Sequence, residues 1–287
     1  MERDGRRSDP HASTSPTTRE AGRRDLIRLA AAGGIGLAAA TVLPRRWTTP
    51  VVESVVLPLH AQGSPRVLPG LYGGSGGSGT GELFRINTST GAGTLVGALP
   101  FGVTEIEYDP GTGRAWAQSE DGDFTIQQFD MATGAGIGSP IDDAAAFNGL
   151  EYIGATLYGT AITGSGNPSD LRTLNPVTGA SVSIGPTGLG PISGLAYRGG
   201  VLYGVTGGSN PASLVTINVT TGVATVIGAL GIPTGGAGGL QFGPDGRLYA
   251  GGNRANGGNL YVVNTTTGSA TLIGPTGFPS VHGLTLV

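Results

Sequence analysis

Residues Val201–Gly246 read VLYGVTGGSNPASLVTINVTTGVATVIGALGIPTGGAGGLQFGPDG, and most of residues 66–287 repeats this pattern. At its centre, the pentapeptide NVTTG (218–222) lies between the β-branched runs LVTIN and VATVIG. Two such runs joined by a short polar link that ends in glycine predict a β-hairpin. We expect the Asn218 side chain to bond the backbone two residues on, and Gly222 to take the left-handed conformation that a bulged turn needs.

The same turn pattern, Asn or Asp followed by x-x-Thr-Gly, recurs along the chain. It occurs at Asn87–Gly91, Asp130–Gly134, Asn175–Gly179, Asn218–Gly222 and Asn264–Gly268. The five glycines are 43, 45, 43 and 46 residues apart. A fixed period near that length, with four short strands in each period, is typical of the blades of a β-propeller. The sequence therefore predicts an all-β protein.

One strand in each repeat has the form G-L-x-[Y/F] or a variant of it, and we expect it to line the propeller axis. Its apolar key residues are Ile106, Leu150, Leu195, Leu240 and Leu284, spaced 44, 45, 45 and 44 residues apart. Only small residues fit where these inner strands converge, which explains the glycine before the key residue in four of the five repeats.

The order of the strand patterns predicts how the ring closes. The repeats begin at Leu71 with a second strand and end with an inner strand at Gly283–Val287. The last strand then completes the first blade and hides both edges of the array. The prediction is a five-bladed β-propeller of four-stranded antiparallel blades, closed by the C-terminal strand. An open solenoid is the alternative, and it requires polar caps that the sequence does not show.

Composition excludes several classes of function. The chain has 287 residues, 55 of them glycine, and no cysteine, so it has no disulfide, no thiolate metal site and no cysteine nucleophile. Residues 66–287 carry seven Arg against thirteen Asp and Glu, a balance of −6. A sparsely charged, mildly acidic body is a poor binder of phosphate backbones, so we expect no nucleic-acid partner.

Residues 1–62 are predicted to be an export signal and linker. A polar segment (1–22), expected to be disordered, precedes Arg23-Arg24 and an apolar Ala- and Gly-rich run (29–43). That run is shorter than the ~20 residues that cross a bilayer, which favours a signal peptide over a membrane span. An amphipathic helix of a folded domain is the alternative, and the glycines of the run weaken it.

The Arg23-Arg24 segment resembles the twin-arginine export signal, although Gly22 stands where Ser or Thr is usual and Leu26 where Phe is favoured. The resemblance implies an exported protein, periplasmic or extracellular, with no stable membrane span after processing. Cleavage after Ala40 and cleavage after Ala61 both fit the sequence.

The hexapeptide PDGRLY (244–249) carries a family resemblance. With it, the repeats over about residues 66–287 are similar to bacterial extracytoplasmic propellers of the YVTN, NHL and SMP-30 kinds. These turns serve many unrelated functions, so the resemblance implies a fold and a location and leaves the activity open.

The position just before each inner strand should face the mouth of the central channel. The candidate ligand-binding residues there are Thr104, Asn148, Ser193 and His282, with Gly238 in the fifth repeat. Long connections gather on this face, and ligand sites favour such loops because the blades hold them rigidly. The alternative role for these side chains is to cap strand ends and hold water.

A metal site is a second interpretation of the residues near the channel. Glu107 and Glu151 lie one residue beyond the key positions, and with Asn148 and His282 they offer ligands for calcium or another divalent ion, as in SMP-30-like hydrolases. The equivalent positions in the other three repeats hold Ala196, Gln241 and Thr285, so the ring is only partly acidic. The acidic run SEDGD (119–123) lacks further spaced ligands and reads as a solvated turn.

No catalytic residue emerges from the sequence. His282 is the only histidine of the repeats, and no carboxylate is paired with it by sequence position. We therefore expect a non-enzymatic, exported, monomeric propeller without a cofactor, which binds a protein, a glycan or a small molecule through its long-loop face. The alternatives are a metal-dependent hydrolase or lactonase with a site in the channel, and a structural surface protein.

Overall fold

The structure is a computed structural model that describes residues 66–287 except 77–78, 121–123, 143–144, 164–168, 208–210 and 234–235. These residues belong to the compact unit Gln62–Val287. The predicted export signal at Arg23 and Arg24 lies outside the described residues. The described part of the chain contains no helix long and apolar enough to span a membrane.

Five four-stranded antiparallel sheets account for the described fold. From the axis outward, blade 1 consists of β20 (Gly283–Leu286), β1 (Leu71–Gly74), β2 (Glu82–Ile86) and β3 (Gly93–Ala98). Blade 2 consists of β4 (Val103–Asp109), β5 (Arg114–Ser119), β6 (Thr125–Phe129) and β7 (Gly136–Asp142). Blade 3 consists of β8 (Ala146–Ile153), β9 (Thr156–Ile162), β10 (Ser169–Leu174) and β11 (Ser181–Pro186). Blade 4 consists of β12 (Ile192–Arg198), β13 (Val201–Thr206), β14 (Ser213–Ile217) and β15 (Ala224–Ala229). Blade 5 consists of β16 (Ala237–Phe242), β17 (Leu248–Gly252), β18 (Asn259–Val263) and β19 (Ala270–Pro275), with a short 3-10 helix at Arg254–Asn256.

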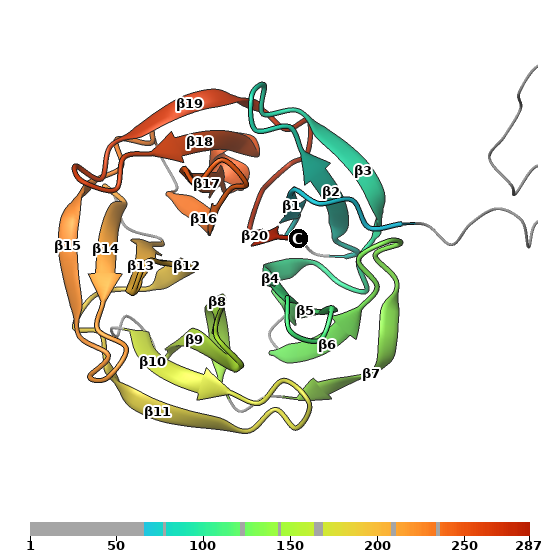
Figure 1. Cartoon of the computed structure of the whole chain (residues 1–287), viewed down its shortest axis with the longest axis horizontal. Helices are drawn as coiled ribbons and strands as arrows, with labels where there is room; N and C mark the ends of the chain where they lie inside the picture. The colour runs from blue at the N-terminus through green and yellow to red at the C-terminus, as the bar shows by residue number, and fades with distance from the viewer. Residues whose placement is uncertain are drawn as a thin grey trace, which may run out of the picture. The chain divides into compact units, whose positions relative to one another are not determined.

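The blades form a closed ring around a central axis (Figure 1). The inner strands β4, β8, β12, β16 and β20 contact one another in turn, and β20 contacts β4 to complete the circuit. The C-terminal strand β20 pairs antiparallel with β1, with Leu284 opposite Gly73. The five-bladed propeller and its closure by the C-terminal strand are therefore confirmed.

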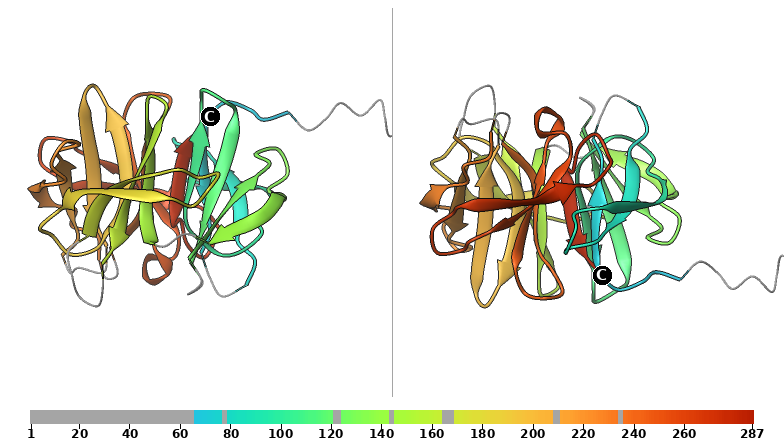
Figure 2. Two further views of the ribbon diagram at one scale, coloured as in Figure 1. Left: turned by 90° about the horizontal axis from the view of Figure 1, so that it is seen from below. Right: turned by 90° about the horizontal axis from the view of Figure 1, so that it is seen from above.

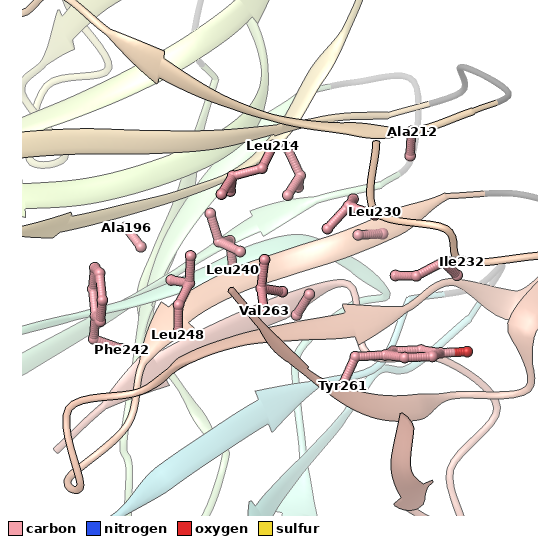
Figure 3. Packing of buried hydrophobic residues seen from close by; sticks show 13 residues of the cluster. Ala196, Ala212, Leu214, Leu230, Ile232, Leu240, Phe242, Leu248, Tyr261 and Val263 are labelled. Atoms are coloured by element: carbon pink, nitrogen blue, oxygen red, sulfur yellow. The ribbon is translucent and has the colours of Figure 1, made fainter. Parts of the chain in front are cut away.

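Hydrophobic clusters fill the space between neighbouring blades. The cluster in Figure 3 joins Leu214 of blade 4 to Leu240, Leu248 and Val263 of blade 5. All six residues of β16 are buried, because both faces of a blade pack against neighbours. This explains why the sequence shows little strict alternation of apolar and polar residues.

The glycines of the inner strands permit the close approach of neighbouring backbones. A Cβ atom at Gly194 would lie 2.7 Å from the backbone nitrogen of Leu240, in the inner strand of the next blade. In β4 this position holds Glu105, whose Oε1 accepts hydrogen bonds from the backbone N–H groups of Leu284 (3.0 Å) and Ile106 (3.1 Å). The predicted need for small residues at the axis is confirmed, and Glu105 replaces one glycine with a side chain that binds the neighbouring strand.

The predicted turns adopt the expected geometry. The Asn218 Oδ1 atom accepts from the N–H groups of Thr220 (2.9 Å) and Thr221 (3.1 Å), and Gly222 has φ +80°. A Cβ atom at Gly222 would lie 2.2 Å from the carbonyl oxygen of Gly185, in the outermost strand of the preceding blade. The turn therefore requires glycine both for its conformation and for its contact with the neighbouring blade.

The outermost strands run around the rim of the ring, as β11 and β19 show in the side views of Figure 2. Backbone hydrogen bonds join the start of one such strand to the segment that follows the outermost strand of the preceding blade. They run from Gly93 N–H to Thr276 O (2.9 Å), from Ala224 N–H to Thr187 O (3.0 Å) and from Ala270 N–H to Leu230 O (2.8 Å). The rim therefore ties blades together at a distance from the axis.

Candidate functional site

Two cavities lie at the two ends of the propeller axis. The loop-face cavity, of about 300 Å³, is lined by Thr104, Glu120, Phe124, Asn148, Ser193, Gly207, Ala237, Gly238, Asn253 and His282. It lies at the end where second strands lead to third strands. The turn-face cavity, of about 610 Å³, is lined by Glu107, Glu151, Gln241, Arg198, aromatic residues, and Pro110 and Pro244 of the tight turns.

The predicted ligand-binding residues come together at the loop-face cavity. Thr104, Asn148 and Ser193 lie on the inner strands β4, β8 and β12, and His282 directly precedes β20. Gly238, on β16, completes the set of five blades. The repeat register therefore brings residues that are up to 178 positions apart in sequence (104 to 282) together at one small cavity.

The two hydroxyl groups bind the backbone of the next blade. Thr104 Oγ1 donates to the carbonyl oxygen of Phe147 (3.1 Å), and Ser193 Oγ donates to that of Ala237 (2.8 Å). Both therefore cap neighbouring strands, and their oxygen lone pairs remain as acceptors. The side-chain amide of Asn148 has no hydrogen-bond partner among the residues that the structure describes.

A carboxylate that the sequence did not pair with His282 lies beside it. Glu120 Oε2 is 3.7 Å from His282 Nδ1 and 3.6 Å from Arg254 Nη2. The same imidazole nitrogen is 3.3 Å from the carbonyl oxygen of Val103. Burial lowers the pKa of His282, against the opposite effect of the Glu120 carboxylate, which favours a neutral imidazole at pH 7. The sequence placed Glu120 in a solvated turn. Its position directly after β5, in the blade next to the one that β20 completes, is the sequence signal that could have identified it.

Phe124 places an aromatic side chain at the edge of this cavity. The residue is 39% exposed, and its φ of +43° lies in the left-handed region that non-glycine residues rarely adopt. Such strain persists only where the surroundings maintain it, and it is frequent at binding sites.

No protein-family model and no curated protein matches this chain. Among solved structures, it is similar to a chain in the crystal structure of a nidogen/laminin complex, with a TM-score of 0.50 and 12% identity over 76% of this chain and 98% of that chain. The fold is a β-propeller. A structural genomics protein of unknown function from Bacteroides thetaiotaomicron aligns with a TM-score of 0.42 and 15% identity, over 69% of this chain and 56% of that one. At 12% identity, the likeness to the chain of the nidogen/laminin complex concerns the fold alone.

The turn-face cavity of the propeller contains two buried carboxyl groups. Glu107 Oε1 accepts from the backbone N–H of Tyr152 in the next blade (3.2 Å), and its Oε2 accepts from Thr285 Oγ1 in the preceding blade (3.1 Å). Glu151 Oε2 accepts from Gln241 Nε2 (3.2 Å). These side chains join the inner strands of different blades across the axis.

Burial strongly perturbs the carboxyl groups of the axis. Desolvation raises the pKa of Glu107 to about 8, against the lowering effect of its hydrogen bonds. It also raises the pKa of Glu151 and of Glu105 well above the ordinary value, and repulsion from Glu107 adds to both shifts. These groups therefore hold protons at pH values where exposed carboxyls are ionised.

The geometry separates the residues that the metal reading placed together. Asn148 and His282 line the loop-face cavity, whereas Glu107 and Glu151 line the turn-face cavity. Among the described residues, no three histidine, aspartate or glutamate side chains are grouped in a way that could hold a metal ion. The four residues named in that interpretation therefore do not form one ligand set, and we derive no reaction from a divalent ion.

Proposed function

We propose that this propeller is a binding module that takes a small, hydroxyl-rich ligand, such as one sugar unit of a glycan, in its loop-face cavity. The observation that carries the proposal is the convergence of polar side chains from different blades on one cavity beside an exposed aromatic ring. Its volume of about 300 Å³ lies at the lower end of the range of ligand pockets.

The chemistry of the lining suits a ligand that both donates and accepts hydrogen bonds. Asn148 offers an amide, and Thr104 and Ser193 offer acceptor lone pairs. The neutral His282 ring accepts at one nitrogen and donates at the other, while Phe124 offers an apolar face to the C–H surface of a sugar ring. A propeller fold is consistent with a binding or scaffold module.

A glycan array followed by calorimetric titration of the best monosaccharide tests this proposal. His282→Ala and Asn148→Ala should each weaken binding by roughly tenfold, because each removes a hydrogen bond in a desolvated site. Thr225→Ala, an exposed threonine of the outermost strand β15, is the control and should bind like the wild type. Binding that survives both cavity variants would place the ligand elsewhere on the propeller.

We further propose that the protein is exported, on the strength of the Arg23-Arg24 pattern and the apolar run after it. Cell fractionation and N-terminal sequencing of the mature protein test this. A mature N-terminus just after Ala40 or Ala61 in the exported fraction supports it, and an intact chain confined to the cytoplasm contradicts it.

A further inference from the structure

The carboxyl groups of the turn-face cavity lack a positive partner. Among the described residues, neither Glu107 nor Glu151 has an arginine or histidine within ion-pair distance. Glu105, on the same strand as Glu107 but outside the cavity lining, is 1% exposed, and the repulsion of Glu107 and Glu151 acts on it. Its Oε2 atom is buried with no hydrogen-bond partner among the described residues. Buried carboxyl groups are normally paired with a positive group, so the presence of Glu105, Glu107 and Glu151 without one requires an explanation.

The structural role of Glu107 does not require a charge. Glu107 accepts a hydrogen bond from the backbone N–H of Tyr152 in the next blade. Thr285 is the equivalent residue of the preceding blade, and its Oγ1 accepts from the backbone N–H of Tyr108 (2.9 Å). Gln241, the equivalent residue of blade 5, accepts from the N–H of Phe242 in its own strand (2.7 Å) and contacts another blade by donating to Glu151. The neutral hydroxyl of Thr285 therefore performs the same bridging task as Glu107. Glutamate at two of the five positions therefore adds an ionisable group that the bridging does not need and that a cation in the cavity can pair with.

The remainder of the cavity is apolar and aromatic. The residues two positions beyond the inner-strand key residues line it, and they are Tyr108, Tyr152, Tyr197, Phe242 and Leu286. Arg198, the one arginine in the lining, has its guanidinium carbon 5.4 Å from the centroid of the Phe242 ring. Aromatic rings beside carboxylates are a favourable environment for an organic cation, which is less strongly hydrated than a metal ion.

We propose that the turn-face cavity binds an organic ammonium cation, whose charged head pairs with Glu107 and Glu151 and whose apolar body lies among the aromatic side chains. The cavity volume of about 610 Å³ is within the range of small-molecule sites. This site lies at the opposite end of the axis from the loop-face cavity and does not depend on the function proposed there.

Proton release should accompany binding. A bound cation favours the ionised carboxylate, so a carboxyl that holds a proton at pH 7 gives it to the solvent as the complex forms. The charged and titratable groups near Glu107 and Glu151 are Glu105 and Asp109 on the same strand as Glu107, and Tyr108, Tyr152, Tyr197 and Arg198 in the cavity lining. Since burial raises the pKa of Glu107 to about 8, affinity should rise with pH up to about that value and then level off.

Calorimetric titration of the wild-type propeller with choline and with its neutral isostere 3,3-dimethylbutan-1-ol tests the proposal directly. Choline should bind at least about tenfold more tightly, because only it carries a charge. Titrations in two buffers of different ionisation enthalpy should show proton release at pH 7. Equal binding of the two probes, or no binding of either, overturns the proposal even if no variant can be purified.

Variants locate the site. Glu107→Gln with Glu151→Gln should abolish the preference for choline and the proton release, while circular dichroism shows an intact propeller. Asp130→Asn removes one carboxylate from a peripheral turn, where the other four repeats already have asparagine, and should change neither. If calcium or sodium binds at the two glutamates and choline does not, the site is an inorganic cation site and the proposal is wrong. Loss of glycan binding in His282→Ala with normal choline binding would show that the two sites are separate.

Discussion

At the scale of single residues, the buried glutamates of the axis are the least expected feature of this protein. Glu107 is 3% exposed and Glu151 6%, and each bridges blades through hydrogen bonds that a neutral side chain can also make. A carboxyl whose pKa is higher in the folded than in the unfolded state binds more protons when folded. It therefore destabilises the fold progressively as pH rises from the unfolded to the folded pKa.

This gives a pH-dependent prediction for Glu107→Gln. The ordinary glutamate pKa is 4.5 and that of Glu107 is about 8, so its ionisation weakens the wild type between these two pH values. Each unit of this difference corresponds to about 1.4 kcal/mol. Denaturant unfolding at pH 5 and pH 8 should show that the variant gains stability relative to the wild type at the higher pH.

The comparison of variant and wild type is needed because other groups titrate in the same range. The pKa of His282 is lowered in the folded state, so its titration makes the free energy of unfolding rise with pH up to the ordinary histidine pKa of 6.5. This effect has the opposite sign to that of Glu107. That contribution cancels in the difference. A difference in unfolding free energy that stays constant from pH 5 to pH 8 would mean that Glu107 titrates normally.

At the scale of elements, the turn and the rim strand of the preceding blade form one unit. Gly222 and Gly185 approach so closely that a methyl group on either meets a backbone carbonyl of the other segment. The turn glycine and the glycine near the end of the rim strand are therefore two halves of one contact between blades.

Alanine substitution separates the two requirements on the turn. Gly222→Ala should lower the free energy of unfolding by more than about 1 kcal/mol, because it combines a positive φ with the contact to Gly185. Gly231 has φ +70° and open space around the position of a Cβ atom, so Gly231→Ala reports the backbone strain alone. Chemical denaturation of both variants measures the difference. Equal losses would show that the contact between blades contributes nothing.

The elements were predictable from the sequence because their signals are local. The x-x-Thr-Gly turns and the spacing of Leu150, Leu195 and Leu240 determine hairpins and inner strands without reference to distant residues. The same register correctly placed the residues of the loop-face cavity. Their function as ligand contacts remains a prediction.

Two features of the site were not predictable, for geometric reasons. The approach of Glu120 to His282 joins the end of one strand to the start of another in a neighbouring blade, which no periodicity encodes. Asn148 and Glu151 are both on β8, but three residues of strand separate them by about 10 Å. This separation along the strand places the two residues in two different cavities, whereas the sequence suggested a single site in the channel.

At the scale of the whole molecule, closure through β20 is the feature on which the ring depends. Deletion of residues 283–287 should expose the edge of β1 and remove Leu284, which is 1% exposed, from the cluster between blades 5 and 1. Burial of one such side chain contributes about 1.5–3 kcal/mol. The melting temperature should therefore fall by more than about 4 °C.

Leu284→Ala is the matched comparison, because it removes packing but keeps the pairing with β1. The deletion should reduce the melting temperature further than this substitution does, since it also removes the backbone ladder. If the deletion melts at the parental temperature, the C-terminal strand does not hold the ring closed.

The pairing of β20 with β1 also determines how the protein responds to mechanical force. Gly70 and Val287 bond each other at the end of the ladder, through Gly70 N–H to Val287 O (2.9 Å) and Val287 N–H to Gly70 O (3.0 Å). Tension applied to these two residues therefore loads the terminal pair of the β20–β1 ladder first and opens the ladder one hydrogen bond at a time. A load-bearing tether attached at these positions would unzip this seam at low force, whereas tension between two points on the rim would have to shear several blades at once.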